Sequence, residues 1–458
     1  MKTGVVILAA GQGTRMKSAL PKVLHPLAGK PMLQHVIETA QRLDPETIVV
    51  VYGHGGELVR ERMQECDVEW ALQAEQLGTG HAVQQAMPLL REVDQVLVLY
   101  GDVPLIRAST LERLVEASAE TRMGMLTVEL EEPTGYGRII RDEYERIIRV
   151  VEQKDASAEE LHIHEINAGI MLIGREELGQ WLAEVRNDNA QNEYYLPDII
   201  PMAVGEGHVI ASVHPDDLYE VEGINDRVQL SRLERVYQSR QAESLMRAGA
   251  TLIDPARLDI RGSVSVGQDV VIEPNVILEG NVELGDGVHV GANNVLRDVV
   301  VGSGCRILEN CVIEQAIIGQ ACQIGPFARV RPGTELAERV RIGNFVETKN
   351  AQIAEGSKVN HLSYIGDTTM GRDVNVGAGT ITCNYDGAYK HRTLIGDNAF
   401  IGSNTQIVAP VTIEAGATIG AGSTITKTAP AGKLTLCRTT RQTTIANWVR
   451  PTKKRENH

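Results

Sequence analysis

Residues 395–430 read IGDNAF-IGSNTQ-IVAPVT-IEAGAT-IGAGST-ITKTAP, six lines of six residues that each begin with isoleucine. An earlier block follows the same pattern, with apolar residues at positions 266, 272, 278, 284, 290 and 296. A repeat this short cannot bury its own aliphatic side chain, so successive repeats must stack and share one continuous core. The pattern predicts a parallel β-helix in the second half of the chain.

The repeat is interrupted in a few places. At Val301 and again at Ile318, the apolar residue comes one position earlier than the six-residue spacing predicts. This indicates a shortened strand or corner. The pattern fails for longer within residues 342–353 and 382–395. We interpret these two breaks as surface loops, because insertions in a solenoid lie on its surface and often carry its sites.

Composition limits the classes of protein that this chain can be. Its 458 residues predict two or more domains, and its formal charge of −15 argues against general binding to nucleic acid or anionic membranes. The apolar run at residues 5–10 is too short for a signal peptide or a membrane span. The six cysteines form no CxxC pair and no Cys/His ligand cluster, so we expect reduced thiols. No compartment signal is evident, from which we expect a cytoplasmic protein.

Residues 1–225 alternate between two kinds of segment. Apolar, strand-like runs occur at residues 4–9, 47–52, 95–100, 124–129 and 168–173, and helical patterns lie between them. This alternation predicts an α/β, Rossmann-like domain with a mostly parallel sheet covered on both faces. Ligands of such sheets bind at the carboxyl ends of the strands.

The end of the first expected strand carries a glycine-rich loop. Residues 8–16 read LAAGQGTRM, and Pro21-Lys22 follows closely. Glycines let backbone N–H groups approach phosphate oxygens, while Arg15 and Lys22 supply the cations that neutralise a polyphosphate. The loop is neither a Walker loop nor a GxGxxG motif, because residue 16 is methionine.

This loop, with its arginine and downstream lysine, resembles the signature of the sugar-1-phosphate nucleotidyltransferases. Further segments match in order: Gln73 with residues 77–80, YGDVP at 100–104, YGR at 136–138, Glu152, EIN at 165–167 and EGIN at 222–225. The resemblance implies a nucleotide and sugar site made of Leu8, Ala9, Ala10, Gly11, Gly13, Arg15, Lys22, Gln73, Gly78, Thr79, Tyr100, Gly101, Asp102, Gly137, Glu152, Asn167 and Asn225.

The resemblance also implies catalytic roles for Arg15 and Lys22, and a Mg²⁺ ion held by Asp102 and Asn225. Two protein oxygens suffice for magnesium when phosphate oxygens and water complete its coordination. Taken alone, Asp102 could instead cap a turn, and Asn225 could cap the following helix.

Residues 226–249 have roughly helical apolar spacing and predict a linker helix, after which residues 250–458 form the β-helix domain with a C-terminal tail. The hexads are similar to those of the hexapeptide acyltransferases, whose left-handed β-helices form trimers with acyl-CoA bound between neighbours. The order of parts resembles the bifunctional N-acetylglucosamine-1-phosphate uridyltransferase/glucosamine-1-phosphate acetyltransferase family, which implies UTP and acetyl-CoA as co-substrates, a homotrimer, and no nucleic-acid or membrane-spanning function.

The acetyltransferase resemblance implies a second set of site residues. His361 matches the general base, and histidine suits that role because its ordinary pKa lies near neutrality. The glucosamine-1-phosphate contacts would be Arg331, Lys349, Tyr364 and Asn375. The acetyl-CoA contacts would be Ala378, Asn384, Tyr385, Ser403, Ala421 and Arg438. Without the resemblance, His361 could be an ordinary corner residue, the two cations could be solvated, and Tyr385 could merely pack its loop.

Two other functions remain possible from the sequence. The chain could be a nucleotidyltransferase whose β-helix serves only in oligomerisation, although the segments at His361 and Asn384-Tyr385 weigh against this. It could also be a non-catalytic assembly subunit, which the intact Arg15, Lys22 and Asp102 disfavour. We therefore expect an enzyme that acetylates glucosamine-1-phosphate and then forms UDP-N-acetylglucosamine and pyrophosphate for the cell envelope.

Overall fold

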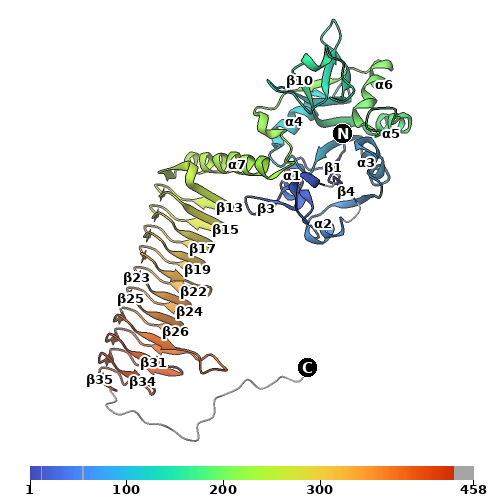
Figure 1. Cartoon of the computed structure of the whole chain (residues 1–458). Helices are drawn as coiled ribbons and strands as arrows, with labels where there is room; N and C mark the ends of the chain where they lie inside the picture. Colours follow the sequence, from blue (N-terminus) through green and yellow to red (C-terminus); the bar gives the residue numbers. More distant parts are fainter. Residues whose placement is uncertain (12, 54–55, 438–458) are drawn as a thin grey trace, which may run out of the picture. The chain divides into compact units, whose positions relative to one another are not determined.

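A computed structural model describes residues 1–11, 13–53 and 56–437. The chain divides into two compact units, and the division falls between Tyr237 and Gln238 (Figure 1). The first unit contains the mixed sheet and its helices, and the second is the β-helix.

The first unit has a sheet with the strand order β11-β7-β10-β6-β1-β4-β5. Strand β10 is antiparallel to both of its neighbours, β6 and β7, whereas the remaining neighbours along this order pair in parallel. A hairpin of β8 and β9 extends from β10. The strands are β1 (Thr3–Leu8), β4 (Thr47–Gly53), β5 (Glu69–Gln73), β6 (Gln95–Tyr100), β7 (Met123–Glu129), β8 (Arg138–Arg141), β9 (Ile147–Val151), β10 (Glu165–Gly174) and β11 (Ala211–Val213).

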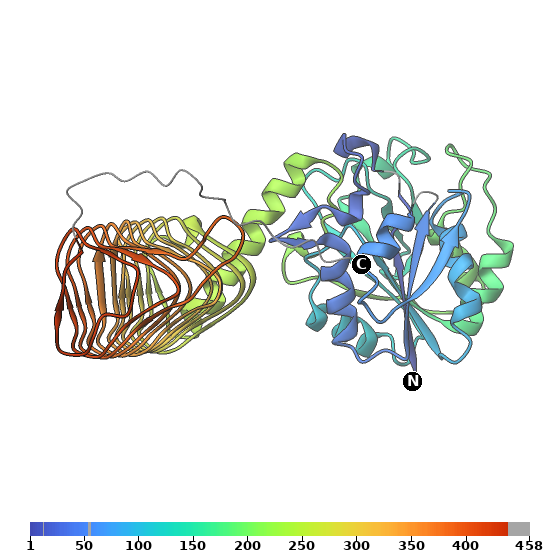
Figure 2. The ribbon, with the colours of Figure 1, turned by 90° about the horizontal axis from the view of Figure 1, so that it is seen from below.

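Helices cover both faces of this sheet (Figure 2). Alternate residues of β1 enter different clusters, since Val6 belongs to one buried core and Val5 and Ile7 belong to another. Two-sided burial explains the nearly continuous apolar strands, and the predicted Rossmann-like α/β fold is confirmed. The helices are α1 (Met32–Gln41), α2 (Glu57–Arg62), α3 (Thr79–Ala86), α4 (Ala108–Ala117), α5 (Arg175–Glu184) and α6 (Ile199–Gly205), and β2 (Pro26–Leu27) pairs with β3 (Lys30–Pro31).

The segment at the division is one helix, α7 (Arg227–Arg247). In the first unit, Leu233 of α7 packs with Leu27 and Met32 in a small buried cluster. In the second unit, Ala242 and Leu245 start the core of the β-helix. The helix therefore contributes an apolar surface to each unit.

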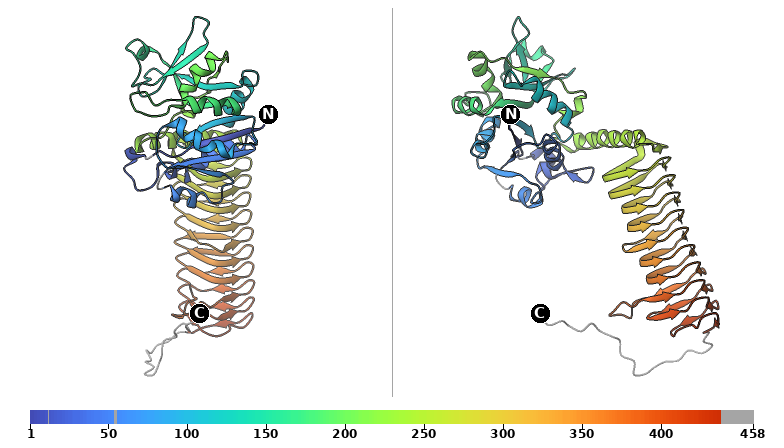
Figure 3. Two further views of the ribbon diagram at one scale, coloured as in Figure 1. Left: turned by 90° about the vertical axis from the view of Figure 1, so that its right-hand side faces the viewer. Right: turned by 180° about the vertical axis from the view of Figure 1, so that it is seen from behind.

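The second unit is the parallel β-helix that the hexads predict, with the left-handed winding that the acyltransferase resemblance implies, and its coils continue evenly from yellow to red in Figure 3. Within the described residues, one sheet of eleven strands comprises β12 (Thr251–Leu252), β14 (Val271–Ile272), β16 (His289–Val290), β18 (Arg306–Ile307), β20 (Gln323–Ile324), β23 (Arg341–Asn344), β25 (Lys358–His361), β27 (Asn375–Val376), β30 (Phe400–Ile401), β33 (Thr418–Ile419) and β35 (Leu434–Thr435). The other sheet comprises β13 (Leu258–Val266), β15 (Val276–Leu284), β17 (Val295–Val301), β19 (Val312–Ile318), β21 (Arg329–Val330), β22 (Thr334–Leu336), β24 (Glu347–Ile353), β26 (Tyr364–Met370), β28 (Ile381–Cys383), β29 (Thr393–Ile395), β31 (Gln406–Val408), β32 (Val411–Ile413) and β34 (Thr424–Ile425).

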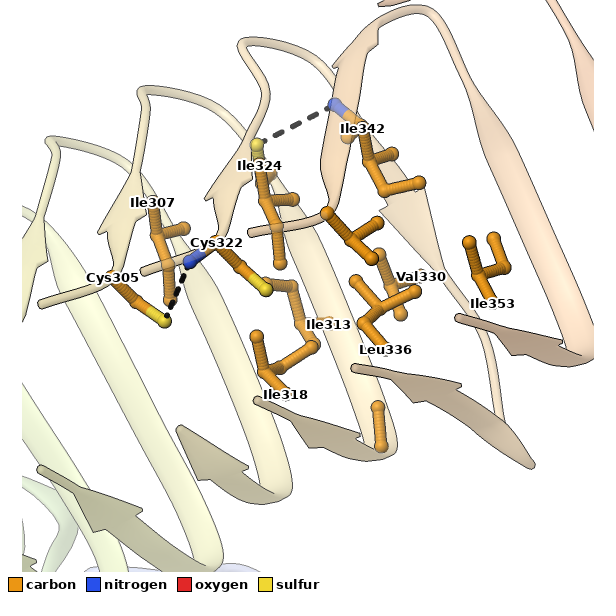
Figure 4. Packing of buried hydrophobic residues seen from close by; sticks show 14 of the residues in the cluster. Cys305, Ile307, Ile313, Ile318, Cys322, Ile324, Val330, Leu336, Ile342 and Ile353 are labelled. Carbon is orange, nitrogen blue, oxygen red and sulfur yellow. Dashed lines mark hydrogen bonds between the residues drawn. The ribbon is translucent and has the colours of Figure 1, made fainter. Parts of the chain in front are cut away.

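The hexad residues fill the interior of the coils. Figure 4 shows Ile307, Ile324 and Ile342 from successive coils in one packed core. Cys305 and Cys322 belong to the same cluster, and both are free thiols. Small aliphatic and thiol side chains suit this narrow interior, which accounts for an aromatic content of 4%.

One of the two loop predictions, that for residues 342–353, is wrong. Residues 342–353 form a regular coil, in which Thr348 pairs in register with Val330 on one side and Ile365 on the other. Thr348 is fully buried, and its hydroxyl lies 3.2 Å from that of Thr334. Threonine replaces an aliphatic residue here because it is β-branched and its hydroxyl finds a buried partner. The repeat therefore continues through residues 342–353 with a threonine at a position where an aliphatic residue was expected.

The other predicted loop is present. Tyr364 pairs with Ile381, 17 residues later, whereas Met370 pairs with Ile395, 25 residues later. The eight additional residues (25 less 17) form a hairpin that projects from the even stack of coils (Figure 3). Residues 384–392 of this hairpin include Asn384 and Tyr385, two of the predicted acetyl-CoA contacts.

Candidate active sites

The glycine-rich loop of the first unit follows β1 and leads into a short 3₁₀ turn, Thr14–Met16. Gly13 has a φ of 62°, and a Cβ atom at this position would lie 2.6 Å from Cβ of Lys22. Only glycine allows this conformation together with such a close approach to Lys22. The loop is thereby held beside the lysine that the sequence assigns to the phosphates.

A cavity of about 340 Å³ lies at the carboxyl ends of β1, β5 and β6. The predicted residues that line it are Leu8, Ala9, Ala10, Gly11, Lys22, Gln73, Gly78, Thr79, Tyr100 and Asp102. Gln76 and Glu193 also line it but were not predicted. The Gln76 amide donates a hydrogen bond to the Ala10 carbonyl, and its place between the matched Gln73 and residues 77–80 was the available signal. Glu193 comes from a distant part of the chain and had none.

Lys22, Asp102 and Asn225 meet at one side of this cavity. The Lys22 ammonium group forms an ion pair with Asp102 and lies 3.2 Å from Oδ1 of Asn225. The N–H of Ile224 donates to the Asp102 carbonyl at 2.8 Å, which ties the segment before α7 to the end of β6. Two oxygens that converge on one ammonium group are also placed to converge on a metal cation.

This pair fits magnesium chemistry. The described part of the chain has no group of three or more His, Cys, Asp or Glu side chains that could hold a metal ion. A carboxylate and an amide oxygen are nevertheless suitable ligands, because Mg²⁺ commonly keeps water and phosphate oxygens in its coordination shell. Asp226 receives the N–H groups of Val228 and Gln229 at 2.9 Å and so caps α7, which leaves Asn225 available to the site.

The predicted sugar contacts form a neighbouring group. Asn167 donates its N–H to the Gly137 carbonyl at 2.9 Å, and a Cβ atom on Gly137 would lie 3.0 Å from Oε1 of Glu152. Burial, and then the nearby Asp198 and other carboxylates, raise the pKa of Glu152. These three residues lie together but do not line the 340 Å³ cavity.

Two other predicted residues lie at the edge of this arrangement. Arg15 is exposed on the 3₁₀ turn, where its side chain is accessible to a bound polyphosphate. Gly101 is buried and donates its N–H to the Leu8 carbonyl at 2.9 Å. Gly101 therefore joins two strand ends and does not face the cavity.

In the second unit, the predicted phosphate-binding cations occupy one position on successive coils. Arg331 and Lys349 share this position, because the preceding residues Val330 and Thr348 are register partners. Arg331 pairs with Glu347 at 2.7 Å. The pKa of Lys349 is lowered mainly by the adjacent Lys390 and also by burial and Arg331. Three cations crowded together in this way make a site that attracts an anion.

Lys390 was not predicted as a site residue. It belongs to the hairpin of residues 384–392, and only the fold brings it beside Lys349. The same hairpin carries Asn384, whose amide nitrogen lies 3.4 Å from the Tyr364 hydroxyl. Arg331, Lys349, Tyr364 and Asn384 are thus brought to one face of the β-helix.

His361 lies at the corner that precedes this face, and its side chain is exposed. Asn344 of the previous coil is its register partner. The pairing of Val359 with Val376 places Ala378 at the same corner of the next coil. Hydrogen bonds from Asn404 N–H to the Ala378 carbonyl at 2.7 Å, and from Gly422 N–H to the Ser403 carbonyl at 2.8 Å, continue this column through Ser403 and Ala421.

The predicted acetyl-CoA residues Ala378, Ser403 and Ala421 therefore form one column, which continues from His361 along the same corner of the following coils. Asn375 lies on β27, in the sheet before the corner, and is not on the face that carries the cations. Tyr385 is exposed and donates to the Gly387 carbonyl at 2.7 Å, which is a contact within its own hairpin. Arg438 lies outside the described residues.

Within residues 1–11, 13–53 and 56–437, no helix combines the length and the apolar character needed to cross a membrane.

Comparison with known proteins identifies both units. A MobA-like NTP transferase domain matches residues 5–165, a GMPPB C-terminal domain matches residues 259–346, and six bacterial transferase hexapeptide repeats match residues 392–427. The bifunctional protein GlmU of Ralstonia nicotianae is 59% identical over 99% of this chain and 99% of its own. The chain belongs to the GlmU family.

A second relative supports the same assignment. The bifunctional protein GlmU of Azoarcus sp. is 58% identical over 98% of this chain and 100% of its own. A solved structure, UDP-glucose pyrophosphorylase complexed with UDP-glucose, has a TM-score of 0.44 and 18% identity over 52% of this chain and 100% of that chain. The assignment depends on the full-length relatives.

Membership in this family decides between the functions left open by the sequence. The chain is a bifunctional enzyme, with a nucleotidyltransferase first unit and a hexapeptide acyltransferase second unit. It is neither a nucleotidyltransferase with a purely structural β-helix nor a non-catalytic assembly subunit.

Proposed function

We propose that residues 250–458 acetylate glucosamine-1-phosphate with acetyl-CoA, and that residues 1–225 transfer UMP from UTP to the resulting N-acetylglucosamine-1-phosphate. The products are pyrophosphate and UDP-N-acetylglucosamine, a precursor of peptidoglycan and lipopolysaccharide. The observation that carries this proposal is that each of the two compact units holds cations beside candidate reaction groups. Lys22 lies with Asp102 and Asn225 in the first unit, and Arg331, Lys349 and Lys390 lie together in the second.

In uridylyl transfer, an anionic sugar phosphate must attack the α-phosphate of an anionic nucleotide. Lys22 and Arg15 would neutralise the triphosphate, while Gln73 and Gly78 would hold the base at the far end of the cavity. Asp102 and Asn225 would hold Mg²⁺, which when bound supplies further charge neutralisation. Gly137, Glu152 and Asn167 would contact the sugar.

In acetyl transfer, the amine of glucosamine-1-phosphate must lose a proton before or as it attacks the thioester carbonyl. Arg331 and Lys349 would bind its phosphate and Tyr364 would contact the sugar from the same face, whereas Asn375 would contact the sugar from the sheet on the other side of the corner. His361 would accept the proton of the amine. The new bond is the amide bond, the bond that breaks is the carbon–sulfur bond, and coenzyme A leaves as the thiol.

We further propose that acetyl-CoA binds along the column of Ala378, Ser403 and Ala421 in a homotrimer formed by the β-helices. Asn384 and Tyr385 would lie at the acetyl end, and Arg438 would reach the coenzyme from the C-terminal segment. Light scattering tests the trimer, because a monomeric mass would contradict it. The cytoplasmic location expected from the sequence remains a prediction.

The direct test is an omission experiment. The enzyme is incubated with glucosamine-1-phosphate, acetyl-CoA, UTP and Mg²⁺, and the products are identified by mass spectrometry. Omission of acetyl-CoA should prevent formation of UDP-N-acetylglucosamine, whereas omission of UTP should leave N-acetylglucosamine-1-phosphate. Formation of a UDP-sugar without any acetylated intermediate would contradict the proposed order.

A further inference from the structure

A column of residues with left-handed backbone conformation follows the cation-bearing face of the β-helix. It passes through Gly333, Asn350 and Asp367, whose φ angles are 77°, 45° and 47°. Residues beside them pair in register from coil to coil, as Lys349 does with Gly366. Asn384 lies 17 positions after Asp367 (384 less 367) and is where the chain leaves the coil for the hairpin.

Asp367 is the charged member of this column nearest the site, and its side chain is only 8% exposed. Its Oδ1 atom accepts a hydrogen bond from the Asn350 amide at 2.6 Å, and its Oδ2 atom accepts one from the Asn384 amide. Because an ionised carboxylate can only accept hydrogen bonds, both neighbouring amides must turn their NH₂ groups toward it. Asp367 therefore selects one of the two orientations of the Asn384 amide.

The selected orientation has a consequence for the site. The amide nitrogen of Asn384 has two hydrogens, and Asp367 receives one of them. The same nitrogen lies 3.4 Å from the Tyr364 hydroxyl, on the side of the predicted amino-sugar site. The second hydrogen is thus donated to the Tyr364 hydroxyl in a long hydrogen bond, on the side where the acetyl group would meet the amine. If the amide were reversed, it would present a carbonyl oxygen there.

We propose that Asp367 is a positioning residue for acetyl transfer, which acts through Asn384. By fixing the Asn384 amide, it keeps an N–H donor on the side of the Tyr364 hydroxyl, from which this donor would pass to the thioester carbonyl oxygen as negative charge develops there during attack by the amine. This inference depends on the proposed acetyltransferase function of the second unit. Asp367 also partly offsets the mutual repulsion of the cations, since its charge opposes the lowering of the Lys349 pKa.

The first test is Asp367→Asn in the full-length enzyme. The new amide would place an NH₂ group or a carbonyl where two donors now converge, so the orientation of Asn384 would no longer be determined. We expect kcat for acetyl transfer to fall by about 10- to 100-fold, with KM for glucosamine-1-phosphate changed less than about twofold. Uridylyl transfer by the same preparation should keep its rate.

The matched control is Asp298→Asn. Asp298 also has a left-handed conformation, with φ 50°, and its Oδ1 accepts a backbone N–H from Asn281 at 3.0 Å. It lies in earlier coils, away from the cations, and an asparagine can still accept that bond. Acetyl transfer should be unchanged in this control. An equal loss of acetyl transfer in the two variants would overturn the proposal.

A double-mutant cycle tests whether Asp367 acts through Asn384. Asp367→Asn should cost little further activity in an Asn384→Ala background, because the group that it orients is already absent. Additive losses in the two variants would contradict the proposed route.

An exchange variant, Asp367→Asn with Asn384→Asp, separates positioning from structural support. It restores a hydrogen bond between the two positions but leaves no N–H donor at position 384. We expect the thermal unfolding midpoint to recover while acetyl transfer stays low. Recovery of activity along with stability would show a purely structural role and overturn the proposal. Absence of acetyl transfer in the unmodified enzyme would instead refute the proposed function itself.

Discussion

The two units of this enzyme build a site for anions in different ways. In the first unit, Lys22, Asp102 and Asn225 come from three distant segments that meet at strand ends. In the second unit, Arg331 and Lys349 hold the same position on neighbouring coils, and register alone brings them together. A convergent site depends on the conformations of its loops, whereas a stacked site depends on the continuity of the repeat. The predictions below test this difference.

The largest expected effect is on acetyl transfer in His361→Ala. Loss of a general base costs about 10²- to 10⁴-fold. Because His361 is an exposed corner residue, its replacement by alanine should leave the fold intact. A coupled assay of thiol release measures the rate. His289→Ala, on another coil of the β-helix, is the control and should keep full activity, as should uridylyl transfer in both variants.

Asp102→Asn should have the next largest effect, and this time on the first unit. It removes the carboxylate that pairs with Lys22 and the charge proposed to hold Mg²⁺. We expect uridylyl transfer to fall by about 100-fold or more and to need a higher Mg²⁺ concentration, because site electrostatics dominate this chemistry. Pyrophosphate release measures this rate. A matched change at the exposed Asp67 should have no effect, and unchanged activity in Asp102→Asn would refute the metal assignment.

The difference between the two units also explains which features of the fold and the sites could be predicted from the sequence. The hexads predicted the β-helix because every coil must bury a residue at the same position, as Ile324 and Ile342 do. The same rule failed at Thr348, where a buried hydroxyl replaced an aliphatic group. In the first unit, Gln73 and Asp102 were recognised from motifs, but Glu193 reaches the cavity only through the folding of a distant segment. Lys390 was missed for the same reason.

Core substitutions in the β-helix should have intermediate effects on stability. Leu336→Ala removes a buried hexad side chain and should cost about 2–5 kcal/mol. Thr348→Val keeps the shape of the side chain but leaves the Thr334 hydroxyl without this partner, and should cost about 1 kcal/mol. Denaturant unfolding followed by circular dichroism compares them. A larger loss for Thr348→Val than for Leu336→Ala would contradict the assignment of Thr348 to a regular coil.

The smallest effect concerns pH and the first unit. Burial, with a contribution from Asp155, raises the pKa of Asp198 to about 6 from an ordinary value of 3.8. The folded state therefore keeps this proton between about pH 4 and 6 while the unfolded state releases it, so this group lowers stability as pH rises through that window. Asp198→Asn should raise the free energy of unfolding by about 1 kcal/mol at pH 7.5, after allowance for solvent screening, and have little effect at pH 4.

Urea unfolding followed by tryptophan fluorescence at the two pH values measures this difference. A gain of equal size at both pH values would show that the effect of Asp198→Asn comes from packing and not from the raised pKa.

The central claim is that the two reactions occur at independent sites on one chain. The most direct measurement mixes the His361→Ala and Asp102→Asn enzymes with glucosamine-1-phosphate, acetyl-CoA, UTP and Mg²⁺, and follows UDP-N-acetylglucosamine by mass spectrometry. Each variant alone should make little UDP-N-acetylglucosamine, whereas the mixture should form it readily, because one enzyme supplies the intermediate that the other consumes. Failure of the mixture to form this product would contradict the claim of two independent sites.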